Sequence, residues 1–155
     1  MARASGPDLW PEGAQLSLEV PRESVGYAYW AAERLDPVVI GNTRFICFGH
    51  TGSSGSVLLN TVTGAVVESD DELESVSLVN SSLETFTACV KGVIERFPFY
   101  SEGADENEWE SAADDVASLV RRVDPAAFVE GGYWHEMTSD IRMGDYATEA
   151  VLNLE

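Results

Sequence analysis

The sequence is poor in the residues that carry most enzyme and metal chemistry. Its 155 residues include two cysteines and two histidines, and no stretch approaches the roughly 18 apolar residues that a membrane helix needs. Lysine and arginine together number 9, against 27 aspartates and glutamates. The few thiols and imidazoles disfavour a metal centre and a disulfide scaffold, and no cofactor is expected. The few cations disfavour direct binding of nucleic acid or of an anionic membrane.

The two cysteines lie in apolar surroundings and far apart in the chain. Cys47 belongs to segment 45–48, and Cys89 belongs to segment 86–90. Unpaired cysteines are among the most buried residues, and disulfides are rare in a reducing cytosol. We therefore expect two buried free thiols. Residues 1–13 lack the basic and apolar regions of a signal peptide, so a cytoplasmic protein is expected.

What the chain does have is sufficient apolar content to fold and a large excess of negative charge. Hydrophobic residues make up 45% of it, and the formal net charge is -18. This length suits one domain with a core of its own. Residues 1–15, rich in glycine, proline and alanine, are predicted to be a loose N-terminal arm, and residues 16–155 a single domain.

Short apolar segments separated by turn residues predict a meander of antiparallel strands. The predicted strands cover residues 16–20, 38–40, 44–48, 56–60, 65–67 and 75–79. Gly64 stands where a hairpin turn requires a positive φ. Residues 27–35 are compatible with a short helix or with irregular structure.

Two amphipathic helices are predicted after the strands. In the first, the apolar residues recur at spacings of three and four, and Ser81 with Glu84 predicts a capping box. The second runs from the region of Trp109 to Val123, before Asp124 and a proline. The apolar stripe of the first helix consists of Leu83, Phe86, Val90, Val93 and Phe97.

The segment 131–144 is predicted to form a final strand entered through a Gly-Gly turn. Tyr133, His135 and Met137 would lie on one face of this strand, and Trp134 on the other. Strands followed by helices predict an α+β fold, with a mostly antiparallel sheet and helices packed against it.

Candidate catalytic groups are scarce. His50 lies in a glycine- and serine-rich loop beside Ser53 and Ser54, and His135 lies in the predicted last strand. A hydrolase built on either histidine remains an alternative, but the Gly-x-Ser-x-Gly pattern of a nucleophile elbow is missing. The loop 49–55 also departs from phosphate-binding patterns and contains no lysine. We therefore expect a protein that is not an enzyme.

Acidic residues and tryptophans are the candidates for binding a partner. Five acids occur within seven residues and predict an exposed loop without the spacing of a calcium site. A second acidic stretch covers residues 102–110. Trp109 suits the helix core, whereas Trp30 and Trp134 could serve either the core or a partner contact. The five clustered acids are Glu68, Asp70, Asp71, Glu72 and Glu74.

The order of these segments resembles the SUKH superfamily, specifically the immunity proteins of its fourth subfamily. The similarity covers residues 35–146 and depends on the order and spacing of motifs, each of which is unspecific alone. A strand containing Ile40-Gly41 is followed by Thr63-Gly64-Ala65-Val66, and a helix opens with Asn80-Ser81-Ser82-Leu83. A Trp-containing second helix and a closing segment at 134–146 complete the resemblance.

This resemblance implies an α+β fold with a central mixed sheet and no catalytic residues. It implies a cognate partner, a toxin domain of a polymorphic toxin system, commonly a nuclease or a nucleic-acid deaminase. The negative charge of the chain would suit a basic toxin. A cytosolic scaffold or regulatory module with an ordinary cellular partner is the alternative from the residues, and a small hydrolase is the second.

Overall fold

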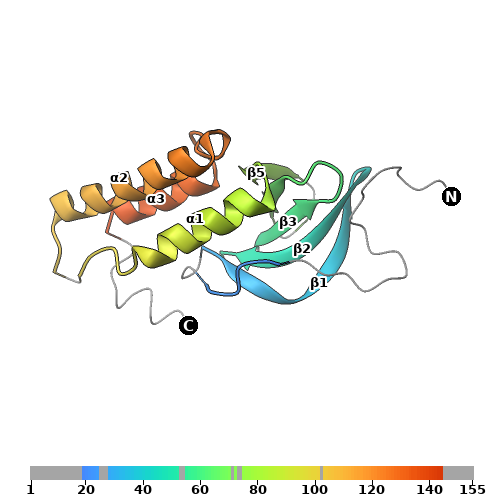
Figure 1. The fold of residues 1–155 in the computed structure, drawn as a ribbon, viewed down its shortest axis with the longest axis horizontal. Coiled ribbons are helices and arrows are strands. Elements are labelled where there is room, and N and C mark those ends of the chain that lie inside the picture. Colours follow the sequence, from blue (N-terminus) through green and yellow to red (C-terminus); the bar gives the residue numbers. More distant parts are fainter. Residues whose placement is uncertain are drawn as a thin grey trace.

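The computed structural model describes residues 19–24, 28–52, 55–70, 72, 75–101 and 103–144. They form a five-stranded sheet with helices packed on one of its faces, an α+β fold as predicted (Figure 1). The elements in chain order are β1 (Trp30–Ile40), β2 (Thr43–Thr51), β3 (Gly55–Asn60), β4 (Val66–Ser69), β5 (Val76–Asn80), α1 (Leu83–Glu95), α2 (Glu106–Val123), the 3₁₀ turn η1 (Pro125–Ala127) and α3 (Tyr133–Arg142).

The sheet is an antiparallel meander in the order β1-β2-β3-β4-β5, which confirms the predicted hairpins. All four strand pairs are antiparallel, so the sheet is not mixed. Gly64 has a φ of 83°, as the turn between β3 and β4 requires. The Asn60 side chain accepts hydrogen bonds from the amides of Val62 and Thr63 and so holds the same turn.

The start of the sheet differs from the prediction. Residues 28–35, expected to be helical or irregular, lead into and form the first half of the long strand β1, whose register shifts between Ala31 and Asp36. Aromatic residues at the beginning of β1 suit a half-buried sheet better than a short helix. The predicted strand 16–20 is absent at Glu19 and Val20, and its first three residues lie outside the described chain, as does the predicted arm 1–15.

Helix α1 covers one face of the sheet, and its predicted apolar stripe is confirmed. Phe86, Val90 and Val93 are buried in the main core. Gly92 faces Leu119 of α2, and a Cβ there would come within 2.7 Å of the leucine side chain, so the glycine permits close helix packing. The predicted range of α2 is also confirmed, with its start at Glu106.

The predicted capping box of α1 is displaced by one residue. Ser82, not Ser81, is the N-cap, and its hydroxyl accepts a hydrogen bond from the amide of Thr85 at 3.1 Å. The Ser82 amide in turn donates to the Thr85 hydroxyl. Ser81 instead donates to Asp124, and this long-range contact decides between two adjacent serines that look equivalent in the sequence.

The predicted final strand is wrong, because residues 133–142 form helix α3. The sequence of this segment fits both the two-residue period of a strand and the 3.6-residue period of a helix, since apolar and polar residues partly alternate. Its buried residues nevertheless recur with the helical period, and Gly132 is the N-cap. They are Tyr133, Trp134, Met137, Thr138 and Ile141.

A buried polar cluster joins β5 to the three helices. The Asp124 carboxylate at the end of α2 accepts hydrogen bonds from the Asn80 amide, from the Ser81 amide and hydroxyl, and from the Thr85 hydroxyl, at 2.7–3.0 Å. The Trp134 indole of α3 donates to Asn80 at 2.9 Å. Burial alone would raise the pKa of Asp124, but these hydrogen bonds together lower it.

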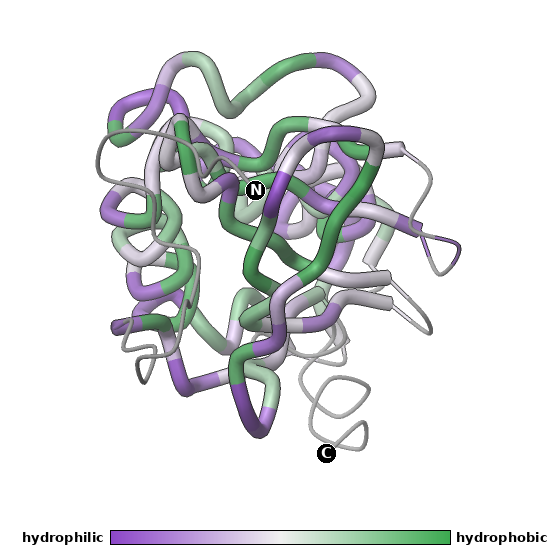
Figure 2. The backbone as a smooth tube through the Cα atoms, turned by 90° about the vertical axis from the view of Figure 1, so that its right-hand side faces the viewer, coloured by the Kyte–Doolittle hydropathy of each residue, from purple (hydrophilic) through white to green (hydrophobic). Residues whose placement is uncertain are grey.

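The two faces of the sheet are differently covered. The helix face carries the main core, whereas a smaller cluster of Phe45, Cys47, Leu58 and Val67 lies on the other face. The two cysteines therefore lie on opposite sides of the sheet, and both are free, as predicted. Figure 2 shows that hydrophobic stretches of the chain alternate with hydrophilic ones. Within the described residues, no helix is long and apolar enough to cross a membrane.

Candidate functional site

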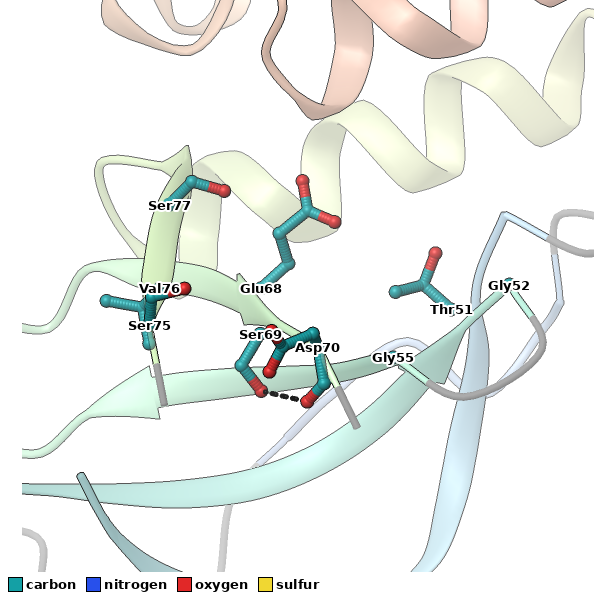
Figure 3. A pocket seen from close by; sticks show the side chains of 9 residues that line it. All are labelled: Thr51, Gly52, Gly55, Glu68, Ser69, Asp70, Ser75, Val76 and Ser77. Carbon is teal, nitrogen blue, oxygen red and sulfur yellow. Dashed lines mark hydrogen bonds between the residues drawn. The ribbon is translucent and has the colours of Figure 1, made fainter. Parts of the chain in front are cut away.

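An acidic pocket opens at the end of the sheet where β2 meets β3 and β4 leads to β5. Its volume is about 410 Å³. Figure 3 shows Glu68 and Thr51 pointing toward the helix side of this pocket, with Asp70 at its centre. None of the described residues that line it is basic. They are Thr51, Gly52, Gly55, Glu68, Ser69, Asp70, Ser75, Val76 and Ser77.

Glu68 is the more buried of the two described acids that line this pocket, and its location differs from the prediction. Glu68 does not belong to an exposed loop but to strand β4, and it is half-buried on the helix side. Burial and the nearby Glu136 carboxylate raise the pKa of Glu68, against a smaller opposing effect of the Ser77 hydroxyl. A cation in the pocket would stabilise the ionised form of this carboxylate, which burial and Glu136 disfavour.

A second, smaller cavity adjoins the acidic pocket between the sheet and α3. Its volume is about 160 Å³, and it shares Thr51, Gly52 and Glu68 with the first. Helix α3 adds two acids to this cavity, Glu136 and Asp140. The two cavities together therefore form one negatively charged recess on both sides of Glu68.

The sequence did not single out these two α3 acids as site residues. Glu136 and Asp140 are four residues apart, a spacing that places both on one side of a helix. The helical spacing of Tyr133, Met137 and Ile141 was the available signal, and the strand prediction concealed it.

The remaining predicted acids are placed only in part. Asp70 lines the acidic pocket and is exposed, and its side chain accepts a hydrogen bond from the amide of Glu72, which is exposed as well. Asp71 and Glu74 lie outside the described residues. The structure thus brings Glu68 and Asp70 into one recess and leaves Glu72 beside it.

The two candidate tryptophans have different locations. Trp30 is 37% exposed at the start of β1, with its ring centroid 6.0 Å from that of His50. Trp134 is 1% exposed and packs against Phe86 and Tyr133. Trp134 is therefore a core residue and offers nothing to a surface contact.

Trp30 and the acidic pocket belong to the same end of the sheet. The register pairs Trp30 with His50, His50 with Ser56, Ser56 with Ser69, and Ser69 with Val76. This cross-strand row, from Trp30 to Val76, spans roughly 19 Å at about 4.8 Å per strand. Ser69 and Val76 line the pocket, so the row connects the exposed tryptophan to the acids.

The two histidines lie in different elements of the described chain. His50 lies in strand β2, not in the loop where it was predicted, and His135 lies in α3. The His135 Nδ1 accepts a hydrogen bond from the amide of Gly131. Among the described residues, no group of three or more histidine, cysteine or acidic side chains could hold a metal ion.

Comparison with known families decides what kind of protein carries this recess. The sequence model of the SUKH-4 immunity protein family matches residues 7–140. The chain belongs to the SUKH-4 immunity protein family. The match includes every strand, helices α1 and α2, and most of α3. No curated protein and no solved structure matches the chain.

For this SUKH-4 protein, we expect Glu68→Gln to raise the thermal unfolding midpoint at neutral pH. A folded-state pKa above the ordinary value of 4.5 means that ionising Glu68 disfavours the folded state. The gain should shrink as the pH falls and become small below pH 4.5, where the wild-type side chain becomes protonated in the unfolded state as well. Thermal unfolding of both proteins between pH 4 and pH 8 measures this, and a less stable variant at pH 7 would contradict it.

Proposed function

We propose that this chain is an immunity protein that binds and neutralises a cognate toxin domain, and that the toxin is a basic nuclease or nucleic-acid deaminase. The observation that carries the proposal is membership of the SUKH-4 immunity family together with the net charge of -18. Enzymes that act on nucleic acids must accommodate a polyanion, and they usually do so with a positively charged surface. An acidic inhibitor has the charge that complements such a surface.

The partner-binding surface in this proposal is the acidic end of the sheet. It comprises the two cavities around Glu68, the neighbouring acids and the exposed Trp30. The carboxylates would accelerate the encounter, because long-range attraction raises association rates, and the aromatic and apolar groups would slow dissociation. Binding would occlude the toxin's active site, so the chain itself needs no catalytic residue. The neighbouring acids are those that follow Glu68 in the sequence, Asp70, Asp71, Glu72 and Glu74.

Co-expression with the toxin domain encoded beside this chain tests the proposal. We expect cells that produce both proteins to survive, cells that produce the toxin alone to die, and the two proteins to co-purify. Death despite co-expression with every adjacent candidate toxin, without a complex, would contradict the immunity role and favour a cytosolic scaffold.

The same assay separates binding from catalysis. The double variant His50→Ala, His135→Ala removes both imidazoles of the chain. We expect full protection by this variant, because occlusion requires no general base. Loss of protection with an unchanged complex would instead indicate a hydrolase.

A further inference from the structure

The two edge strands of the sheet are protected to very different degrees. Strand β1, at one edge, contains Glu33, Arg34, Asp36 and Pro37 and has an irregular register. Charged side chains, prolines and bulges are the devices by which proteins prevent an edge from pairing with another strand. Strand β5, at the opposite edge, has no charged residue or proline, since segment 75–80 reads Ser-Val-Ser-Leu-Val-Asn, and its register with β4 shifts only near its end, between Leu78 and Asn80.

The unprotected edge is open only along its first half. Val79 and Asn80 are fully buried, and the cluster around Asp124 holds this half of the strand. Val76 and Leu78 are 40% and 37% exposed on the face away from the helices, and Ser77 is exposed on the helix side. The first half of β5 is therefore accessible on both faces.

The acidic pocket lies directly at this open edge. Ser75, Val76 and Ser77 line it together with Glu68 and Asp70. A strand that paired with β5 would direct alternate side chains to opposite faces of the sheet. Those on one face would meet Val76 and Leu78, and those on the other face would meet Glu68.

Accepting the proposed immunity function, we infer that the toxin domain docks by adding an extended basic segment to the open edge of β5, with a lysine or arginine side chain entering the acidic pocket toward Glu68. The backbone supplies pairing over about four residues, and the pocket supplies charge recognition. A second copy of this chain does not suit the edge, because each copy carries a charge of -18 and pairing would bring two acidic pockets together.

The test is the affinity of the adjacent toxin domain for Val76→Lys, Leu78→Lys and the double variant. The introduced lysines repel a basic segment and hinder close approach at this edge. We expect the double variant to weaken binding by about 100-fold or more, a loss typical of central contacts. Val39→Lys is the matched control, because Val39 is a 58% exposed valine in the opposite edge strand, and its effect should stay within about threefold.

Amide hydrogen exchange of the wild-type complex gives an answer that does not depend on the folding of any variant. We expect those amides of residues 75–78 that point away from β4 to exchange at least about tenfold more slowly in the complex. A complex of unchanged affinity with the double variant, or no slower exchange of those amides, would overturn edge docking and leave the immunity role intact. Failure of the wild-type chain to bind or protect would instead refute both.

Discussion

Replacing Asp124 by alanine is expected to destabilise the fold by about 3 kcal/mol, because the change leaves several buried donors without their charged acceptor. The carboxylate receives four hydrogen bonds, from Asn80, Ser81 and Thr85. Through them it holds the end of α2 against β5 and the start of α1. For a domain whose total stability is about 5–15 kcal/mol, this is a large share.

Urea unfolding at pH 7 measures the effect, and Asp105→Ala provides a matched control. Asp105 is the exposed N-cap of α2, and its side chain accepts a hydrogen bond from the amide of Glu108. Losing such a cap costs about 1 kcal/mol. Equal losses of stability in the two alanine variants would show that the buried cluster around Asp124 contributes no more than an exposed helix cap.

The stabilisation by Asp124 should disappear in acid. Its folded-state pKa lies below the ordinary 3.8, so its contribution is complete above pH 3.8 and is lost as the pH falls through the lowered value. The difference between wild type and Asp124→Ala should therefore be constant from pH 7 to pH 5 and shrink below pH 3.8. A difference that shrinks already between pH 7 and pH 5 would contradict the lowered pKa.

Reversing the charge of the acids that follow Glu68 in the sequence is expected to slow association with the toxin by about one to two orders of magnitude at low salt. The variant carries lysine at Asp70, Asp71, Glu72 and Glu74. Long-range attraction speeds the encounter of oppositely charged surfaces, so removing it lowers the association rate far more than it raises the dissociation rate. Stopped-flow or surface-binding kinetics at several salt concentrations measure both rates.

A variant with the same change of net charge elsewhere distinguishes local from overall steering. It carries lysine at Glu102, Glu106, Glu108 and Glu110, and α2 begins at the far left of Figure 1, away from β5. We expect a smaller decrease of the association rate for this variant, and a weaker salt dependence for the variant at the pocket. Equal decreases would assign the steering to net charge, and an unchanged, salt-insensitive rate for both would refute steering.

The predictable parts of this protein were those governed by neighbours in sequence. The meander between residues 38 and 80, the stripe of α1 and the turn at Gly64 follow from apolar periodicity and turn chemistry, which act over a few residues. The family resemblance likewise depended on the order of such local motifs, and it was confirmed.

Two of the errors share a physical origin, which is competition between patterns that only distant contacts resolve. Residues 133–142 can be written with a period of two or of 3.6, and packing against Asn80 and Phe86 selects the helix. The choice of Ser82 over Ser81 as the cap depends on Asp124, which lies more than 40 residues away. Local propensity differences are small beside such buried interactions.

The properties of the candidate site also fall into two groups, those set by the sequence alone and those that arise on folding. The sequence alone determined the negative charge, the cluster of acids after residue 67 and the scarcity of catalytic groups, because composition is independent of folding. The tertiary structure decided that Glu68 is half-buried, that α3 adds Glu136 and Asp140, and that β5 is an unprotected edge beside them. Burial and strand order are properties of the whole chain, since each arises from residues that meet only after folding.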